Sequence, residues 1–143
     1  MSEMLLPVIG DDETPFWEAA RKGELRIQTC KSCDRMRFPP RPMCPWCNST
    51  QSEWKLTQGR GTIWSFVVPH PPLLPQFMDL APYLVIAVTL DEDPKIRFIG
   101  NLVERSGDAI NVIDPSTIEI GQAVEVFFDP VNEEIHMPRW VRV

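Results

Sequence analysis

All four cysteines of this 143-residue chain lie in one short stretch, as two C-x-x-C pairs. The first pair is Cys30 and Cys33, and the second is Cys44 and Cys47. Paired units of this kind are typical of metal sites, whereas secreted domains usually spread their disulfides along the fold. Four thiolates around one ion leave no position for water, so such a site is structural. We therefore expect these cysteines to bind zinc, with rubredoxin-like iron or a thiol redox pair as alternatives.

The position of the cysteines also predicts how the chain is divided. A unit of fewer than about 40 residues usually needs a metal or disulfides to remain folded. We expect residues 1–52 to form an N-terminal helix and a zinc ribbon, and residues 53–143 to form a second domain. The chain has 15 prolines, about twice the average usage, so we expect a mainly β protein with few long helices.

Individual elements follow from local patterns. A short helix is expected over residues 14–22, with Thr14 as its N-cap and Pro15 at its first position, and a strand should lead into Cys30. Five later segments are rich in β-branched and aromatic residues: 61–70, 83–91, 96–104, 123–129 and 135–143. Residues 111–121 should form a partly helical insert after the third strand. This order predicts a five-stranded OB-fold barrel.

Charge is distributed unevenly along the chain, whose net charge is −6. Residues 21–41 hold seven basic and two acidic side chains, whereas the remainder is strongly acidic. Lys31, Arg35 and Arg37 would partly balance the negative charge of a zinc ion with four thiolates. Alternatively, the rigid segment Phe38-Pro39-Pro40-Arg41 between the two cysteine pairs would hold a phosphate or a nucleotide. Both interpretations stay open at this point.

Aromatic residues of the first barrel strand are a second candidate surface. Trp64 and Phe66 alternate with Ile63, Ser65 and Val67, and we expect one set to fill the barrel and the other to lie under a neighbouring segment. Stacking of nucleic-acid bases on these rings is the alternative. The acidity of this half of the chain argues against it, because phosphate backbones need a basic groove.

No catalytic constellation is evident in the sequence. Neither histidine has a serine or cysteine nucleophile signature around it, and no glycine-rich phosphate loop is present. The N-terminus lacks a signal-peptide pattern, and no apolar run reaches about 18 residues. We therefore expect no catalytic residues in this chain and a reducing cytoplasmic location.

Several motifs together resemble a known protein family. They are Phe16-Trp17-Glu18-Ala19-Ala20, Gly23-Glu24-Leu25, the two cysteine pairs with Phe38-Pro39-Pro40-Arg41 between them, Gly59-Arg60-Gly61-Thr62-Ile63-Trp64-Ser65, Pro82-Tyr83, Gly121-Gln122-Ala123-Val124 and Pro138-Arg139-Trp140. The chain resembles, over nearly its whole length, the family once catalogued as domain of unknown function 35 (DUF35). Asp34 departs from the pattern, because many relatives have glycine there, and an aspartate adopts a left-handed backbone less readily.

The resemblance implies an N-terminal helical hairpin, a rubredoxin-like zinc ribbon and a C-terminal OB-fold. It also implies a non-catalytic accessory subunit that forms a hetero-oligomer with a thiolase-fold enzyme. Such partners include thiolases, hydroxymethylglutaryl-CoA synthase and side-chain-cleaving aldolases that act on acyl-CoA thioesters, bulky aromatic or steroid ones among them. The candidate residues for CoA or partner binding are Arg35, Arg37, Phe38, Pro39, Pro40, Arg41, Trp64, Phe66 and Phe77. The apolar loop 69–78 would cover an acyl chain or dock on the partner. A single-stranded nucleic-acid-binding protein is the alternative function, and an electron carrier is a weaker one.

Overall fold

The computed structural model describes residues 4–143, so the first three residues of the expected N-terminal unit lie outside it. Helix α1 spans Thr14–Arg21, close to the predicted range. The prediction of Thr14 as N-cap is wrong, because Glu13 holds that position and the Thr14 hydroxyl donates to the Gly10 carbonyl at 3.0 Å. Within the described residues α1 is the only helix before the ribbon, so the implied helical hairpin is not found.

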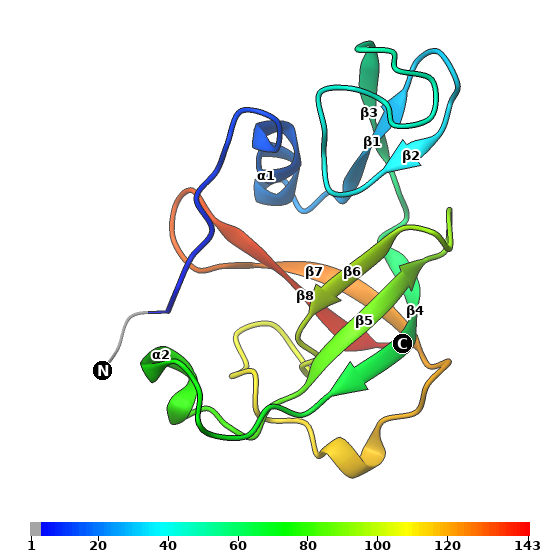
Figure 1. Cartoon of the computed structure of the whole chain (residues 1–143). Helices are drawn as coiled ribbons and strands as arrows, with labels where there is room; N and C mark the ends of the chain where they lie inside the picture. The colour runs from blue at the N-terminus through cyan, green and yellow to red at the C-terminus, as the bar shows by residue number, and fades with distance from the viewer. Residues whose placement is uncertain (1–3) are drawn as a thin grey trace.

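The ribbon is built on a small antiparallel sheet that follows α1. Its strands are β1 (Arg26–Cys30), β2 (Met36–Arg37) and β3 (Ser52–Leu56), in the order β2-β1-β3. The strand leading into Cys30 is confirmed, whereas β2 and β3 were not predicted. Strand β3 pairs with β1 along its whole length and continues toward the barrel (Figure 1). Because β3 begins at Ser52, it crosses the predicted domain boundary between residues 52 and 53. That boundary stays a proposal.

The second sheet is the expected OB-fold, and all five predicted strands are present. They are β4 (Arg60–Val67), β5 (Val85–Leu90), β6 (Arg97–Gly100), β7 (Ala123–Pro130) and β8 (His136–Arg142), in the order β6-β5-β4-β7-β8. Most are somewhat shorter than predicted, whereas β4 begins one residue earlier and β7 ends one residue later. A parallel bridge between Leu102 and Trp140 brings the two outer strands together. The sheet is therefore curled into a partly closed barrel, as in OB-folds.

The connections contain two short helical turns. The insert after β6 includes the expected turn, η1 (Pro115–Thr117), and the Asp114 carboxylate caps it by accepting the Ser116 N–H at 3.0 Å. The apolar loop between β4 and β5 contains α2 (Pro75–Met78), which was not predicted. Leu74 and Met78 in this loop are exposed.

A β-bulge changes the expected alternation of aromatic side chains on β4. Ile63 pairs with Val88 and Ser65 with Ala87, so Trp64 is the extra residue of the bulge. Phe66 consequently packs against the core, whereas Trp64 is 52% exposed on the outer face of the sheet. The expectation that a neighbouring segment covers this set is therefore wrong for Trp64.

The ribbon and the barrel share one hydrophobic core. Phe16 and Trp17 of α1 and Ile27 of β1 belong to the same buried cluster as Trp140 of β8. Phe38 joins the two parts directly, because its ring lies 4.3 Å from Phe98 of β6 and 5.9 Å from Phe16, centroid to centroid. Figure 1 shows α1 between the ribbon sheet and the long β7–β8 hairpin. The ribbon is thus fixed on the barrel by packing.

Candidate metal centre and basic pocket

The four cysteines of the ribbon converge on one point. Their Sγ atoms all lie within 4.8 Å of one another. The Cys30–Cys47 separation is 3.5 Å and the Cys33–Cys44 separation is 3.6 Å. Sulfur atoms about 2.3 Å from a tetrahedral zinc ion would lie about 3.8 Å apart. The four cysteines are therefore positioned to bind a metal ion, and their spacing suits zinc.

Both cysteine pairs lie in equivalent turns, or knuckles. In the first, the Asp34 N–H donates to the Cys30 carbonyl at 3.0 Å; in the second, the Asn48 N–H donates to the Cys44 carbonyl at 2.9 Å. Asp34 has a φ of 61° and Asn48 a φ of 63°, so both adopt the left-handed conformation. Asp and Asn tolerate this conformation better than most residues. The departure from glycine at Asp34 is thus compatible with the knuckle.

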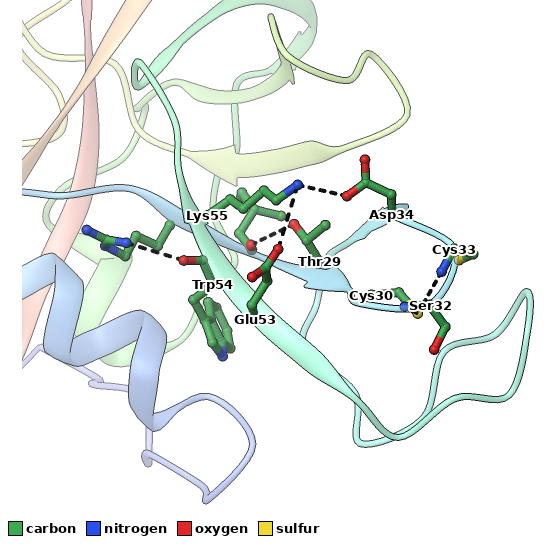
Figure 2. Close-up of polar contacts among 10 residues, drawn as sticks. Thr29, Cys30, Ser32, Cys33, Asp34, Glu53, Trp54 and Lys55 are labelled. Atoms are coloured by element: carbon green, nitrogen blue, oxygen red, sulfur yellow. Dashed lines mark hydrogen bonds and ion pairs between the residues drawn. The ribbon is translucent and has the colours of Figure 1, made fainter.

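Strand β3 supports the first knuckle from outside. The Lys55 ammonium lies 2.7 Å from an Asp34 carboxylate oxygen and 3.7 Å from one of Glu53 (Figure 2). The pKa of Lys55 is raised, chiefly by its hydrogen bond to Asp34. The unpredicted strand β3 therefore carries a cation that holds the residue following the first cysteine pair.

Electrostatics within the cluster favour a bound cation. The pKa of Cys30 is lowered to about 6, chiefly because its Sγ accepts the Cys33 N–H and also the Ser32 N–H (Figure 2). The Ser49 N–H lowers the pKa of Cys47. Burial and the neighbouring thiols together raise it by more, so that the pKa of Cys47 is raised to about 11. The protein alone thus separates the pKa values of adjacent thiols. A divalent cation would offset the repulsion between four thiolates.

A basic pocket of about 430 Å³ lies beside this centre, between the ribbon and the β5–β6 turn. Four of the predicted binding residues line it: Arg35, Arg37, Phe38 and Arg41. Pro39 and Pro40 belong to the same segment but are not among its lining residues. Trp46 and Lys95 also line the pocket and were not predicted. Trp46 could have been predicted from the sequence to lie near the metal centre, because it stands between Cys44 and Cys47. Lys95 is distant in sequence, and only the fold brings it to the pocket.

The other predicted binding residues lie elsewhere. Trp64 and Phe66 of β4 both border a shallow groove in the barrel sheet, but Phe66 packs against the core. The Arg97 guanidinium lies 3.9 Å above the Trp64 ring. Phe77 packs against Tyr83 in the loop between β4 and β5, with ring centroids 5.9 Å apart. The structure therefore does not bring the nine candidates into one site.

Residues 4–143 hold no second group of three or more His, Cys, Asp and Glu side chains close enough to share a metal ion. Across the same residues, no helix combines the length and apolar character needed to cross a membrane. The described part of the chain thus offers one metal centre and one adjacent basic pocket.

Comparisons with known proteins match both halves of the chain. Residues 17–53 match the model of the ChsH2 rubredoxin-like zinc ribbon domain, and residues 54–129 match that of the ChsH2 C-terminal OB-fold domain. A chain of a solved Ltp2-ChsH2(DUF35) aldolase is similar in structure, with 34% identity and a TM-score of 0.80 over 96% of this chain and 98% of that one.

Curated relatives are similar as well. A DUF35 domain-containing scaffold protein of Methanothermobacter thermautotrophicus is 35% identical over 73% of this chain and 71% of its own length. A probable enoyl-CoA hydratase alpha subunit of Thermomonospora curvata is 35% identical over 92% of this chain, which spans only 38% of that protein. Together, the cysteine ribbon, the OB-fold and these matches show that the chain belongs to the DUF35 family with a ChsH2-type zinc ribbon and OB-fold.

Proposed function

We propose that this chain is a non-catalytic accessory subunit of a thiolase-fold enzyme that acts on acyl-CoA thioesters. The single observation that carries the proposal is the likeness to one chain of the Ltp2-ChsH2(DUF35) aldolase over 96% of this chain. That protein is an aldolase, and another relative is named as a hydratase subunit for an enoyl-CoA. A role in assembly with a separate enzyme also suits a chain with one structural metal centre.

Zinc is the metal that we propose for Cys30, Cys33, Cys44 and Cys47. The match to a rubredoxin-like zinc ribbon supports this assignment, and the sulfur separations of 3.5 and 3.6 Å suit a tetrahedral four-thiolate site. When bound, the ion would cross-link the two knuckles and thereby hold the Phe38–Arg41 segment between them. The role of the metal in this proposal is structural.

The acyl part of the thioester is the second element of the proposal. The loop between β4 and β5 exposes apolar side chains, including Leu74 and Met78. Exposed apolar loops of this length are commonly covered by a ligand or a partner. We propose that this loop lies against the thiolase-fold subunit or the acyl chain, and that bulky aromatic or steroid acyl groups are among the substrates.

Reconstitution tests the proposal directly. The zinc-loaded chain is mixed with a thiolase-fold protein encoded beside its gene, and the mixture is analysed by size-exclusion chromatography with light scattering. We expect a hetero-oligomer whose turnover of acyl-CoA is lost when this chain is omitted. Two separate peaks, together with full activity of the partner alone, would show that this chain is no subunit of that enzyme.

Single-stranded nucleic-acid binding is the second candidate, and one observation favours it. Trp64 is 52% exposed, and its ring stacks against the Arg97 guanidinium. Bases stack on exposed aromatics of this kind in OB-folds. Binding of a mixed-sequence oligonucleotide that weakens with rising salt, and is lost in Trp64→Ala, would favour this function over the first.

A further inference from the structure

We propose that two side-chain contacts between the knuckles form a clamp that slows the release of the metal. One contact joins Ser32 to Ser49, and the other joins Arg35 to Trp46. All four residues lie outside the set of cysteine ligands, so they act by positioning the knuckles that carry those ligands. The inference rests on the proposed zinc site and is independent of any partner subunit.

The two knuckles are equivalent turns of six residues, 30–35 and 44–49. In each turn the fifth residue donates its backbone N–H to the carbonyl of the first, and the first donates to the carbonyl of the sixth, at 2.8–3.0 Å. The first cysteine of each turn also approaches the second cysteine of the other turn, with sulfur separations of 3.5 and 3.6 Å. The knuckles are therefore related by approximate two-fold symmetry.

The clamp follows the same symmetry, because the third residue of each turn contacts the sixth residue of the other. The Ser32 hydroxyl donates to the Ser49 hydroxyl at 2.9 Å. The Arg35 guanidinium lies 5.5 Å from the centroid of the Trp46 ring, within the range of a cation–π contact. A two-fold arrangement places these two contacts on opposite sides of the sulfur cluster. The knuckles are thus joined on both flanks of the metal centre.

The sheet holds the two knuckles unequally. The first connects β1 to β2, and Lys55 of β3 braces it through Asp34 (Figure 2). The second lies in the connection between β2 and β3. Its Cys47 is exposed, whereas Cys30 of the first knuckle is buried. We therefore expect metal release to begin with the second knuckle moving away from the first, which is the motion that the clamp opposes.

Ser49 also links the clamp to the backbone of both knuckles. Its hydroxyl accepts the Gln51 N–H at 3.1 Å as well as the bond from Ser32. The Gln51 carbonyl in turn accepts the Lys31 N–H at 3.0 Å. A hydroxyl held by several partners keeps its orientation without help from the metal. The clamp therefore brings the second knuckle to the first before the ion binds.

Exposure sets the size of the expected effect. Ser32 and Arg35 are exposed, and Trp46 is 48% exposed. Loss of an exposed hydrogen bond between neutral groups should speed release about threefold. Loss of an exposed cation–π contact should speed it about twofold to fivefold. Both changes are large enough to measure as rates.

Transfer of zinc from the purified full chain to an excess of a colorimetric chelator tests the clamp. Elemental analysis of the unmutated protein comes first, because a chain without zinc would contradict the metal assignment and not the clamp. Ser32→Ala should release zinc about threefold faster, and Arg35→Gln about twofold to fivefold faster. Arg35→Lys retains a cation for the Trp46 ring and should release zinc at nearly the original rate.

Two contacts of the same kinds in the barrel provide matched controls. The Ser116 hydroxyl donates to an Asp114 carboxylate oxygen at 2.9 Å, and the Arg97 guanidinium lies 3.9 Å above the Trp64 ring. Ser116→Ala and Arg97→Gln therefore lose similar interactions outside the ribbon. Both should release zinc at the rate of the unmutated protein.

A double-mutant cycle shows whether the two serines act through their mutual bond. Ser49→Ala removes the same hydrogen bond as Ser32→Ala. Adding Ser32→Ala to Ser49→Ala should therefore cause no further acceleration. Effects that multiply in the double variant would contradict the inference, since each hydroxyl would then act separately.

The inference is overturned if either Ser32→Ala or Arg35→Gln releases zinc at the rate of the unmutated protein. Equal acceleration in Ser116→Ala and Arg97→Gln would also overturn it, because release would then follow general stability. Fast release from Arg35→Lys, equal to that from Arg35→Gln, would show that the cation on the Trp46 ring contributes nothing. These outcomes are independent of the reconstitution experiment, which depends on the partner.

Discussion

Phe38→Ala probes the connection between the ribbon and the barrel. The Phe38 ring lies 4.3 Å from Phe98 and 5.9 Å from Phe16, so truncation removes contacts to both parts of the shared core. Phe→Ala substitutions in cores cost about 3–5 kcal/mol. Because Phe38 is only partly buried, we expect a loss of about 2–3 kcal/mol in the free energy of unfolding.

Thermal and urea unfolding of the zinc-loaded protein measure this loss. A change of about 2–3 kcal/mol should lower Tm by about 5–10 °C in a chain of this size. Phe77→Ala is the control, since Phe77 contacts Tyr83 in the loop, with centroids 5.9 Å apart, and should cost about 1 kcal/mol or less. Equal losses in both variants, or a loss below about 1 kcal/mol for Phe38→Ala, would refute the shared core.

The other predictions concern the barrel and the knuckles. Gly61→Ala should destabilise the protein by about 1–3 kcal/mol in urea unfolding, because the added methyl group would overlap the Thr89 carbonyl. Gly10→Ala should be nearly neutral, because its methyl group would meet only a Glu13 carboxylate oxygen, at an ordinary contact distance of 3.7 Å, and equal effects would contradict the argument. Asn48→Gly should retain the metal in elemental analysis, whereas Asn48→Val should weaken binding, because a β-branched residue strongly disfavours the φ of 63°; indistinguishable metal affinities would be inconsistent with this account. Cys44→Ser should release the metal and abolish complex formation, and a variant that keeps both would show that the metal is no structural staple.

The metal centre was the most predictable part of the molecule. Ligand type and spacing in a C-x-x-C pair are local properties, so Cys30 and Cys33 specify one knuckle without any tertiary information. The left-handed conformation at Asp34 was expected from the family resemblance, because many relatives have glycine at this position. The five barrel strands were found because each has enough β-branched and aromatic residues to be recognised locally.

Features that depend on tertiary packing were not predictable. Strand β3 has only two apolar side chains, Trp54 and Leu56, which alternate with Glu53 and Lys55 over too short a stretch to define a strand locally, and its pairing with β1 defines it. The exposure of Trp64 results from a bulge, which shifts the side-chain alternation by one residue. Lys95 reaches the basic pocket only because the β5–β6 turn lies against the ribbon.

Co-purification from the native host tests the central proposal most directly. The affinity-tagged chain is isolated at physiological salt, and the associated proteins are identified and quantified by mass spectrometry. The account predicts a thiolase-fold protein in stoichiometric amount, with Cys44→Ser as a control that fails to recover it. A chain that purifies without any thiolase-fold protein, or with nucleic acid in its place, would contradict the proposed role as an accessory subunit.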